Sequence, residues 1–105
     1  MEFDHALCIF YREAFEEGGL WILCAYLRDH EGWTAEQFAR RVEQGVANGE
    51  FGLYVYGRND EFIYVSFDQD RNDIEGYWKE LFFSPNEKTT ELYNVYYERT
   101  RDSQP

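Results

Sequence analysis

The sequence predicts an α+β fold, in which helices cover one face of a small antiparallel sheet. Two alternating apolar runs flank a polar turn at 51–67, and segments with helical periodicity precede and follow this hairpin. Helices, then a hairpin, then a helix and a strand favour α+β over a parallel sheet. At 105 residues the chain is expected to form one domain over 1–100, with a disordered tail at 101–105.

The predicted hairpin at 51–67 is the centre of the sheet. Its two runs alternate around the turn 57–60, so one row of each strand is aliphatic or Phe and the other is aromatic. Period-2 alternation around a Gly/Asn/Asp turn is typical of a β-hairpin. We therefore expect one face to pack on helices and the other to carry Tyr54, Tyr56 and Tyr64.

Helical periodicity predicts helices over about 5–17, 20–30, 34–47 and 73–83. The third is the clearest, because Thr34 and Gln37 form a capping box. Asp4 is the expected N-cap of the first. Residues 6–12 and 20–27 also suit strands, so the sequence leaves helix and strand open there.

A last strand is predicted over about 90–99, since residues 92–97 alternate between two rows. Ser84-Pro85-Asn86 is expected to end the preceding helix. Pairing of this last strand with the hairpin would bring Tyr97 onto the tyrosine-rich face.

The net charge of −11 comes from 21 acidic and 10 basic residues. Such a balance disfavours direct contact with nucleic acid or an anionic membrane, and it favours a basic protein surface. Charge that only supports solubility is the alternative interpretation. Two acidic clusters stand out, one at the end of the first helix and one after the hairpin. Their members are Glu13, Glu16 and Glu17, and Asp68, Asp70, Asp73 and Glu75.

Catalytic and metal-binding patterns are absent from the sequence. Residues 68–73 carry acidic or Asn side chains at the first, third and fifth positions of a calcium loop, but the required Gly and Glu are missing. The histidines and cysteines lack the paired spacing of a zinc site, and no nucleophile–base pair or phosphate loop is present. We therefore expect no enzyme activity, no metal and no cofactor.

The cysteines and the N-terminus indicate the expected compartment. Cys8 and Cys24 lie in apolar runs and are expected to be buried thiols. The first residues lack the basic segment of a signal peptide, and the longest apolar run, 20–27, is too short to span a bilayer. A cytoplasmic protein is expected.

The tyrosine row and the acidic clusters together predict a non-enzymatic protein that binds a basic protein surface. The favoured hypothesis is an inhibitor that occupies the nucleic-acid site of an enzyme or complex, as phage anti-CRISPR and anti-restriction proteins do. An immunity protein for a nuclease toxin, a small-ligand or regulatory domain, and a homodimer are the alternatives. The tyrosines also simply suit strands. The predicted partner-binding residues are Tyr54, Tyr56, Tyr64, Tyr97, Asp68, Asp70, Asp73, Glu75, Glu13, Glu16 and Glu17.

Overall fold

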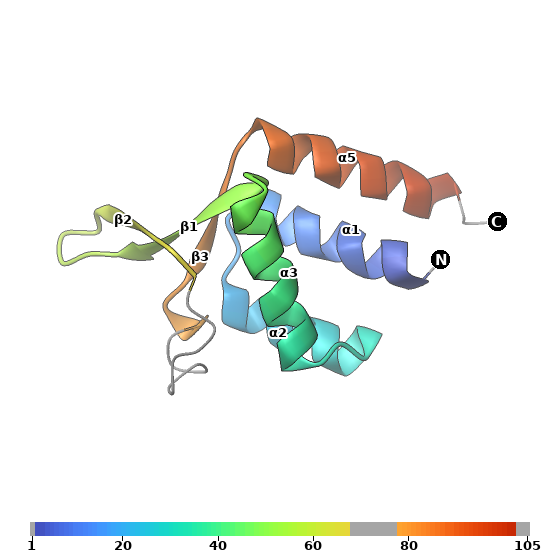
Figure 1. Ribbon diagram of the computed structural model, residues 1–105, viewed down its shortest axis with the longest axis horizontal. Coiled ribbons are helices and arrows are strands. Elements are labelled where there is room, and N and C mark those ends of the chain that lie inside the picture. The colour runs from blue at the N-terminus through green and yellow to red at the C-terminus, as the bar shows by residue number, and fades with distance from the viewer. Residues whose placement is uncertain (1, 68–77, 103–105) are drawn as a thin grey trace.

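Helices lie against a three-stranded antiparallel sheet in the computed structural model of the chain (Figure 1). The structure describes residues 2–67 and 78–102. The α+β prediction is confirmed. The described elements are α1 (Glu2–Phe15), α2 (Leu20–Glu31), α3 (Ala35–Ala47), β1 (Phe51–Tyr56), β2 (Phe62–Val65), β3 (Phe82–Pro85) and α5 (Glu87–Asp102).

The first three helices agree with the sequence, and they settle 6–12 and 20–27 as helical. The capping box of α3 is present: the Gln37 backbone N–H donates to Thr34 Oγ1 at 3.1 Å, and the Thr34 N–H donates to Gln37 Oε1 at 2.8 Å. Gly32 ends α2 in the left-handed conformation, with φ 73°. Asp4 is not an N-cap, because α1 begins two residues earlier.

The predicted hairpin is confirmed as β1 and β2, and the strand order of the sheet is β2-β1-β3. Residues 57–61 form its turn, in which the Gly57 N–H donates to the Glu61 carbonyl at 2.8 Å. The end pairs are Leu53–Val65 and Tyr56–Phe62 between β1 and β2, and Phe51–Pro85 and Tyr54–Phe82 between β1 and β3.

The third strand is not the one that the sequence predicts. Residues 82–85 form β3, so the helix predicted over 73–83 is wrong at its end, while 73–77 lie outside the described residues. Backbone bonds with the α1–α2 connection hold β3 in the sheet: the Leu20 N–H donates to the Leu81 carbonyl, and the Phe83 N–H donates to the Gly18 carbonyl, both at 3.0 Å. Pairing between distant segments therefore outweighs the local helical pattern.

The strand predicted over 90–99 is wrong, because these residues belong to α5. Asn86 begins the helix: its Oδ1 accepts the backbone N–H groups of Lys88 at 2.8 Å and Thr89 at 3.2 Å. A buried Thr89 and the half-buried Leu92, Tyr93 and Tyr96 then recur at helical spacing. The helix also runs through 101–102, where the sequence predicted the start of a tail.

Aromatic rings fill the core between the helices and the inner face of the sheet. Phe10 of α1 is at the centre, and five rings lie within 6.3 Å of its own: Tyr11, Trp33, Phe38, Phe51 and Phe83. Phe51 packs so closely on α3 that a Cβ at Gly45 would lie 2.3 Å from its ring, so only glycine fits there. Both cysteines are free thiols, Cys24 buried and Cys8 half-buried.

Candidate partner-binding surface

Aromatic side chains from all three strands gather on the side of the sheet opposite the core. We call this cluster the outer aromatic face; its members are Tyr54, Tyr56, Phe62, Tyr64 and Phe82. Tyr54 is its centre, with ring centroids 4.9 Å from Phe62, 5.5 Å from Tyr56, 5.6 Å from Phe82 and 6.5 Å from Tyr64. The structure thus brings three of the predicted tyrosines together.

The outer aromatic face has a buried centre and an exposed rim. Tyr54 is 3% exposed, whereas Tyr56 is 51%, Phe62 54% and Tyr64 68% exposed. Large aromatic side chains held in place by a packed neighbour, with one side open to water, are typical of protein interfaces. Tyr54 therefore supports the face from within, and the other three rings are available for contact.

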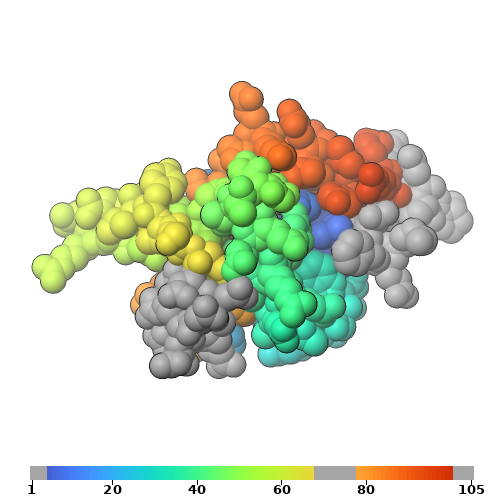
Figure 2. Space-filling view, viewed as in Figure 1, coloured from blue at the N-terminus to red at the C-terminus, as the bar shows by residue number. Residues whose placement is uncertain are grey.

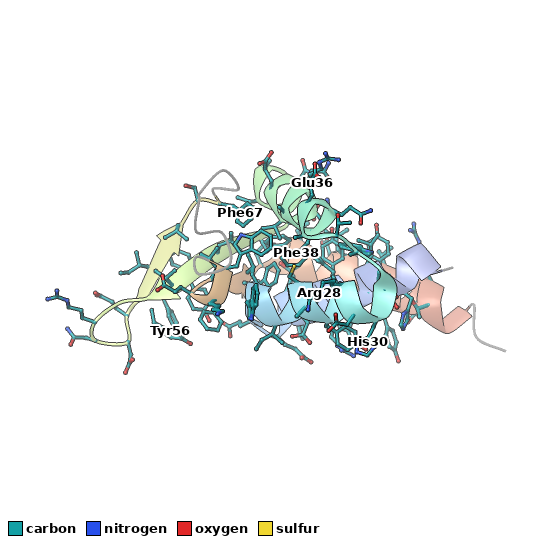
Figure 3. All side chains as sticks on the ribbon, turned by 90° about the horizontal axis from the view of Figure 1, so that it is seen from below. Arg28, His30, Glu36, Phe38, Tyr56 and Phe67 are labelled. Atoms are coloured by element: carbon teal, nitrogen blue, oxygen red, sulfur yellow. The ribbon has the colours of Figure 1, made fainter. Side chains whose placement is uncertain are left out.

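The hairpin continues beyond the sheet as a two-stranded arm, residues 55–63. The last pair between β1 and β3 is Tyr54–Phe82, so the arm has no third strand. It extends about 10 Å further, at about 3.3 Å per residue. Figure 2 shows it as a projection at one end of the molecule, and Figure 3 shows Tyr56 at this end, away from Phe38 in the core.

Tyr97 does not belong to the outer aromatic face, because it lies on α5. It borders a hollow of about 320 Å³ between α1 and α5, together with His5, Cys8 and Arg12. Burial raises the pKa of the Cys8 thiol, and a hydrogen bond with Thr100 and the charge of Arg12 only partly oppose this. Burial therefore disfavours the thiolate form of Cys8.

The end of the first acidic cluster lies next to the outer aromatic face. Glu16 and Glu17 follow α1, in the connection whose Gly18 carbonyl accepts the Phe83 N–H. Burial raises the pKa of Tyr54. The hydrogen bond between Tyr54 and Tyr56 and the charge of Tyr56 raise this pKa further, and so does the negative charge of Glu17. The carboxylate of Glu17 is thus close enough to act electrostatically on the aromatic face.

Glu17 adopts a backbone conformation that favours glycine. Its φ is +59°, in the left-handed region. That conformation costs a non-glycine residue about 1–2 kcal/mol, and Gly18 and Gly19 follow immediately in the sequence. Because backbone outliers cluster at functional sites, Glu17 is a candidate for a functional carboxylate.

Ion pairs are found on α1, α2 and α3, whereas the exposed acids Glu87, Glu91 and Glu98 of α5 have none with a described residue. The ion pairs among the described residues include His5–Glu31, Arg12–Glu13, Arg28–Asp29, Arg40–Glu36 and Arg41–Glu50. All lie in α1, α2, α3 or just before β1. Around the aromatic face and the arm, five carboxylates have no ion pair with a described residue: Glu16, Glu17, Asp60, Glu61 and Glu80. We call these five the unpaired acidic rim.

The two predicted acidic clusters have different outcomes. In the first, Glu13 is paired with Arg12 at 3.8 Å, so the structure separates it from Glu16 and Glu17. The second cluster, Asp68, Asp70, Asp73 and Glu75, lies outside the described residues. Glu80 was considered only as an extension of the second cluster and was not among the predicted partner-binding residues; it was expected within a helix, and it lies just before the third strand.

A buried polar network on the core side was also missed. Glu50 Oε1 accepts a hydrogen bond of 2.5 Å from the Tyr11 hydroxyl, and the Arg41 guanidinium donates to both groups. Burial and the hydrogen bond to Glu50 raise the pKa of Tyr11. Thr89 Oγ1 donates to the Glu50 carbonyl, so the network joins α1, α3 and α5 through the residue just before β1. In the sequence, this network could have been suspected from one acid, Glu50, between Gly49 and an apolar run.

Comparisons with protein-family models, curated proteins and solved structures find no match for this chain. Among the described residues, no helix is both long and apolar enough to cross a membrane. The outer aromatic face and the unpaired acidic rim are therefore the features of the molecule that suggest a function.

Proposed function

We propose that the protein is a non-enzymatic binding protein that docks its outer aromatic face and unpaired acidic rim on a basic surface of a partner protein. The observation that carries the proposal is the meeting of exposed rings and unpaired carboxylates at one end of the molecule. Burial of aromatic rings contributes affinity, and complementary charge contributes rate of association and register.

The exposed rings by themselves are too small an interface. Tyr56, Phe62 and Tyr64 each expose about half to two thirds of their surface, which gives roughly 350 Å² in total for side chains of about 200 Å². A stable interface buries about 800 Å² on each partner. The contact must therefore include the rim, whose carboxylates favour a partner with Lys and Arg at matching positions.

A second copy of this chain is disfavoured as the occupant. Two outer aromatic faces brought together would also bring two unpaired acidic rims together, in a chain of net charge −11. Like charges facing each other across an interface cost several kcal/mol. A basic protein gains attraction from the same carboxylates.

Basic surfaces flanked by apolar grooves are common where proteins hold nucleic acid. Carboxylates of the rim can occupy the positions of phosphates, while the aromatic rings replace stacked bases. We therefore propose inhibition of a nucleic-acid-binding enzyme or complex in the cytoplasm, of the kind that phage anti-CRISPR and anti-restriction proteins carry out. An immunity protein acting on a nuclease toxin would use the same chemistry.

Affinity capture from bacterial lysates at low and high salt tests the proposal, followed by identification of the retained proteins. We expect nucleic-acid-binding proteins that are released by salt and by competing nucleic acid. Tyr64→Ala is expected to reduce retention about tenfold, while Tyr97→Ala on α5 is the matched control and retains the partner. Cleavage assays on the identified enzyme then measure inhibition. Retention that is independent of salt, or equal for Tyr64→Ala and the wild type, contradicts the proposal.

A further inference from the structure

We propose that a hollow at the base of the arm receives an arginine side chain of the partner. This inference rests on the proposed function and names the residue type that the surface recognises. The hollow has a volume of about 270 Å³ and is lined by Val55, Tyr56, Glu80 and Phe82.

The hollow results from the unequal lengths of the strands. β3 begins at Phe82, opposite Tyr54, so β1 runs past it for two residues, Val55 and Tyr56. Glu80 lies just before β3 and is exposed. The open edge of β1, the first ring of β3 and a carboxylate therefore surround one space.

The lining suits a guanidinium group on an apolar stem. The Tyr56 and Phe82 rings lie 5.3 Å apart at 71°, and aromatic rings attract a cation placed over them. Val55 offers apolar contact for the methylene groups, as long basic side chains require. Glu80 supplies the carboxylate that a guanidinium binds through two parallel hydrogen bonds.

Lys79, the residue before Glu80, does not fill this hollow. The Lys79 ammonium lies over the Trp21 ring, 5.2 Å from its centroid. Within the described part of the chain, no basic group forms an ion pair with Glu80. An anion would be repelled by Glu80. A cationic side chain from outside therefore matches the hollow best.

Titration of the ¹⁵N-labelled protein with the peptide N-acetyl-Gly-Arg-Gly amide tests the inference by NMR. We expect the amide signals of Val55, Tyr56, Glu80 and Phe82 to shift most. The lysine peptide should bind a few-fold more weakly, and the neutral citrulline peptide should cause no comparable shift. Shifts equal for the citrulline peptide, or shifts confined to other acidic regions, overturn the assignment.

Glu80→Gln provides the matched variant, with Glu91→Gln on α5 as the control of equal charge change. Both side chains are exposed, so both variants are expected to fold. Glu80→Gln should weaken the arginine peptide about fivefold to tenfold, and Glu91→Gln should leave it unchanged. Glu80→Gln and Tyr64→Ala are also tested for binding to the captured partner. If Glu80→Gln binds it as the wild type does while Tyr64→Ala binds it weakly, only this inference is overturned. Wild-type affinity of Tyr64→Ala overturns the proposed function.

Discussion

At the helical end of the molecule, the rings of Phe10, Tyr11 and Phe38 are buried in the core, although Phe15 and Tyr26 are partly exposed, and several charges on α1, α2 and α3 form ion pairs. At the sheet end, Tyr56, Phe62 and Tyr64 reach solvent beside carboxylates that have no ion pair with a described residue. The same residue types are therefore used in two ways. Aromatic rings enclosed on all sides stabilise the fold, while rings supported on one side remain available for a partner.

Carboxylates also differ between the two ends, being buried in one case and exposed in the other. Glu50 is buried and held by Tyr11 and Arg41, so it is part of the structure. Glu17 and Glu80 are exposed and have no ion pair among the described residues, so we expect that removing their charge changes stability little. Substitutions at the helical end should therefore change stability, and substitutions at the sheet end should change binding.

Replacement of a core ring should have the largest effect. Phe83 is fully buried, with edge contacts to Phe51 at 4.9 Å and to Phe10 at 5.5 Å. Phe83→Ala should lower the free energy of unfolding by about 3–5 kcal/mol. Phe62→Ala on the arm should lower it by about 1 kcal/mol or less. Urea unfolding measures both, and equal losses would remove the distinction between the two ends.

Loss of the buried carboxylate should come next. Glu50→Ala removes the acceptor of the Tyr11 hydroxyl and the charged acceptor of the Arg41 guanidinium, and should destabilise the fold by about 3 kcal/mol. Glu61→Ala, at an exposed carboxylate of the arm, is expected to change stability by less than about 0.5 kcal/mol. A small loss for Glu50→Ala would show that the network contributes little.

Alkaline pH should destabilise the protein through two tyrosines. The folded state raises the pKa of Tyr11 and Tyr54 above the ordinary value of 10.0, chiefly by burial. Above this value the unfolded chain loses protons that the folded chain keeps, so stability is complete below about pH 10 and falls as pH rises. Urea unfolding at pH values from about 8 to 11 should show that the free energy of unfolding decreases from about pH 10 upward. In Tyr54→Phe this decrease should be smaller. An identical pH dependence for Tyr54→Phe would exclude Tyr54 as a contributor.

The smallest expected effect is at Glu17, where one substitution should raise stability and weaken binding. Glu17→Gly should stabilise the fold by about 1 kcal/mol, because glycine adopts the left-handed conformation without strain. It should also weaken partner binding, since a carboxylate of the rim is lost. Glu17→Gln is the control, with reduced binding and unchanged strain. If Glu17→Gly binds as the wild type does, Glu17 is not part of the interface.

Local chemistry could predict most elements, but not their assembly. The capping box of Thr34 and the alternation around the turn 57–60 act within a few residues, so the sequence shows them directly. In α5 the sequence contains both alternation and helical spacing, and the alternation was misleading. The Asn86 cap and contacts with distant residues, such as the stacking of Tyr96 on Tyr11 at 5.4 Å, make the helix the better structure.

The sequence by itself determined the α+β class, the hairpin, three helices, the tyrosine row and the acidic charge. These follow from periodicity and composition, which act within one segment. Tertiary structure alone decided that 82–85 is the third strand, that Glu50 is buried, and that Glu17 and Glu80 lie beside the outer aromatic face. Each of these depends on contacts between segments far apart in the chain, because strand pairing and burial are satisfied by the whole fold and not by local spacing.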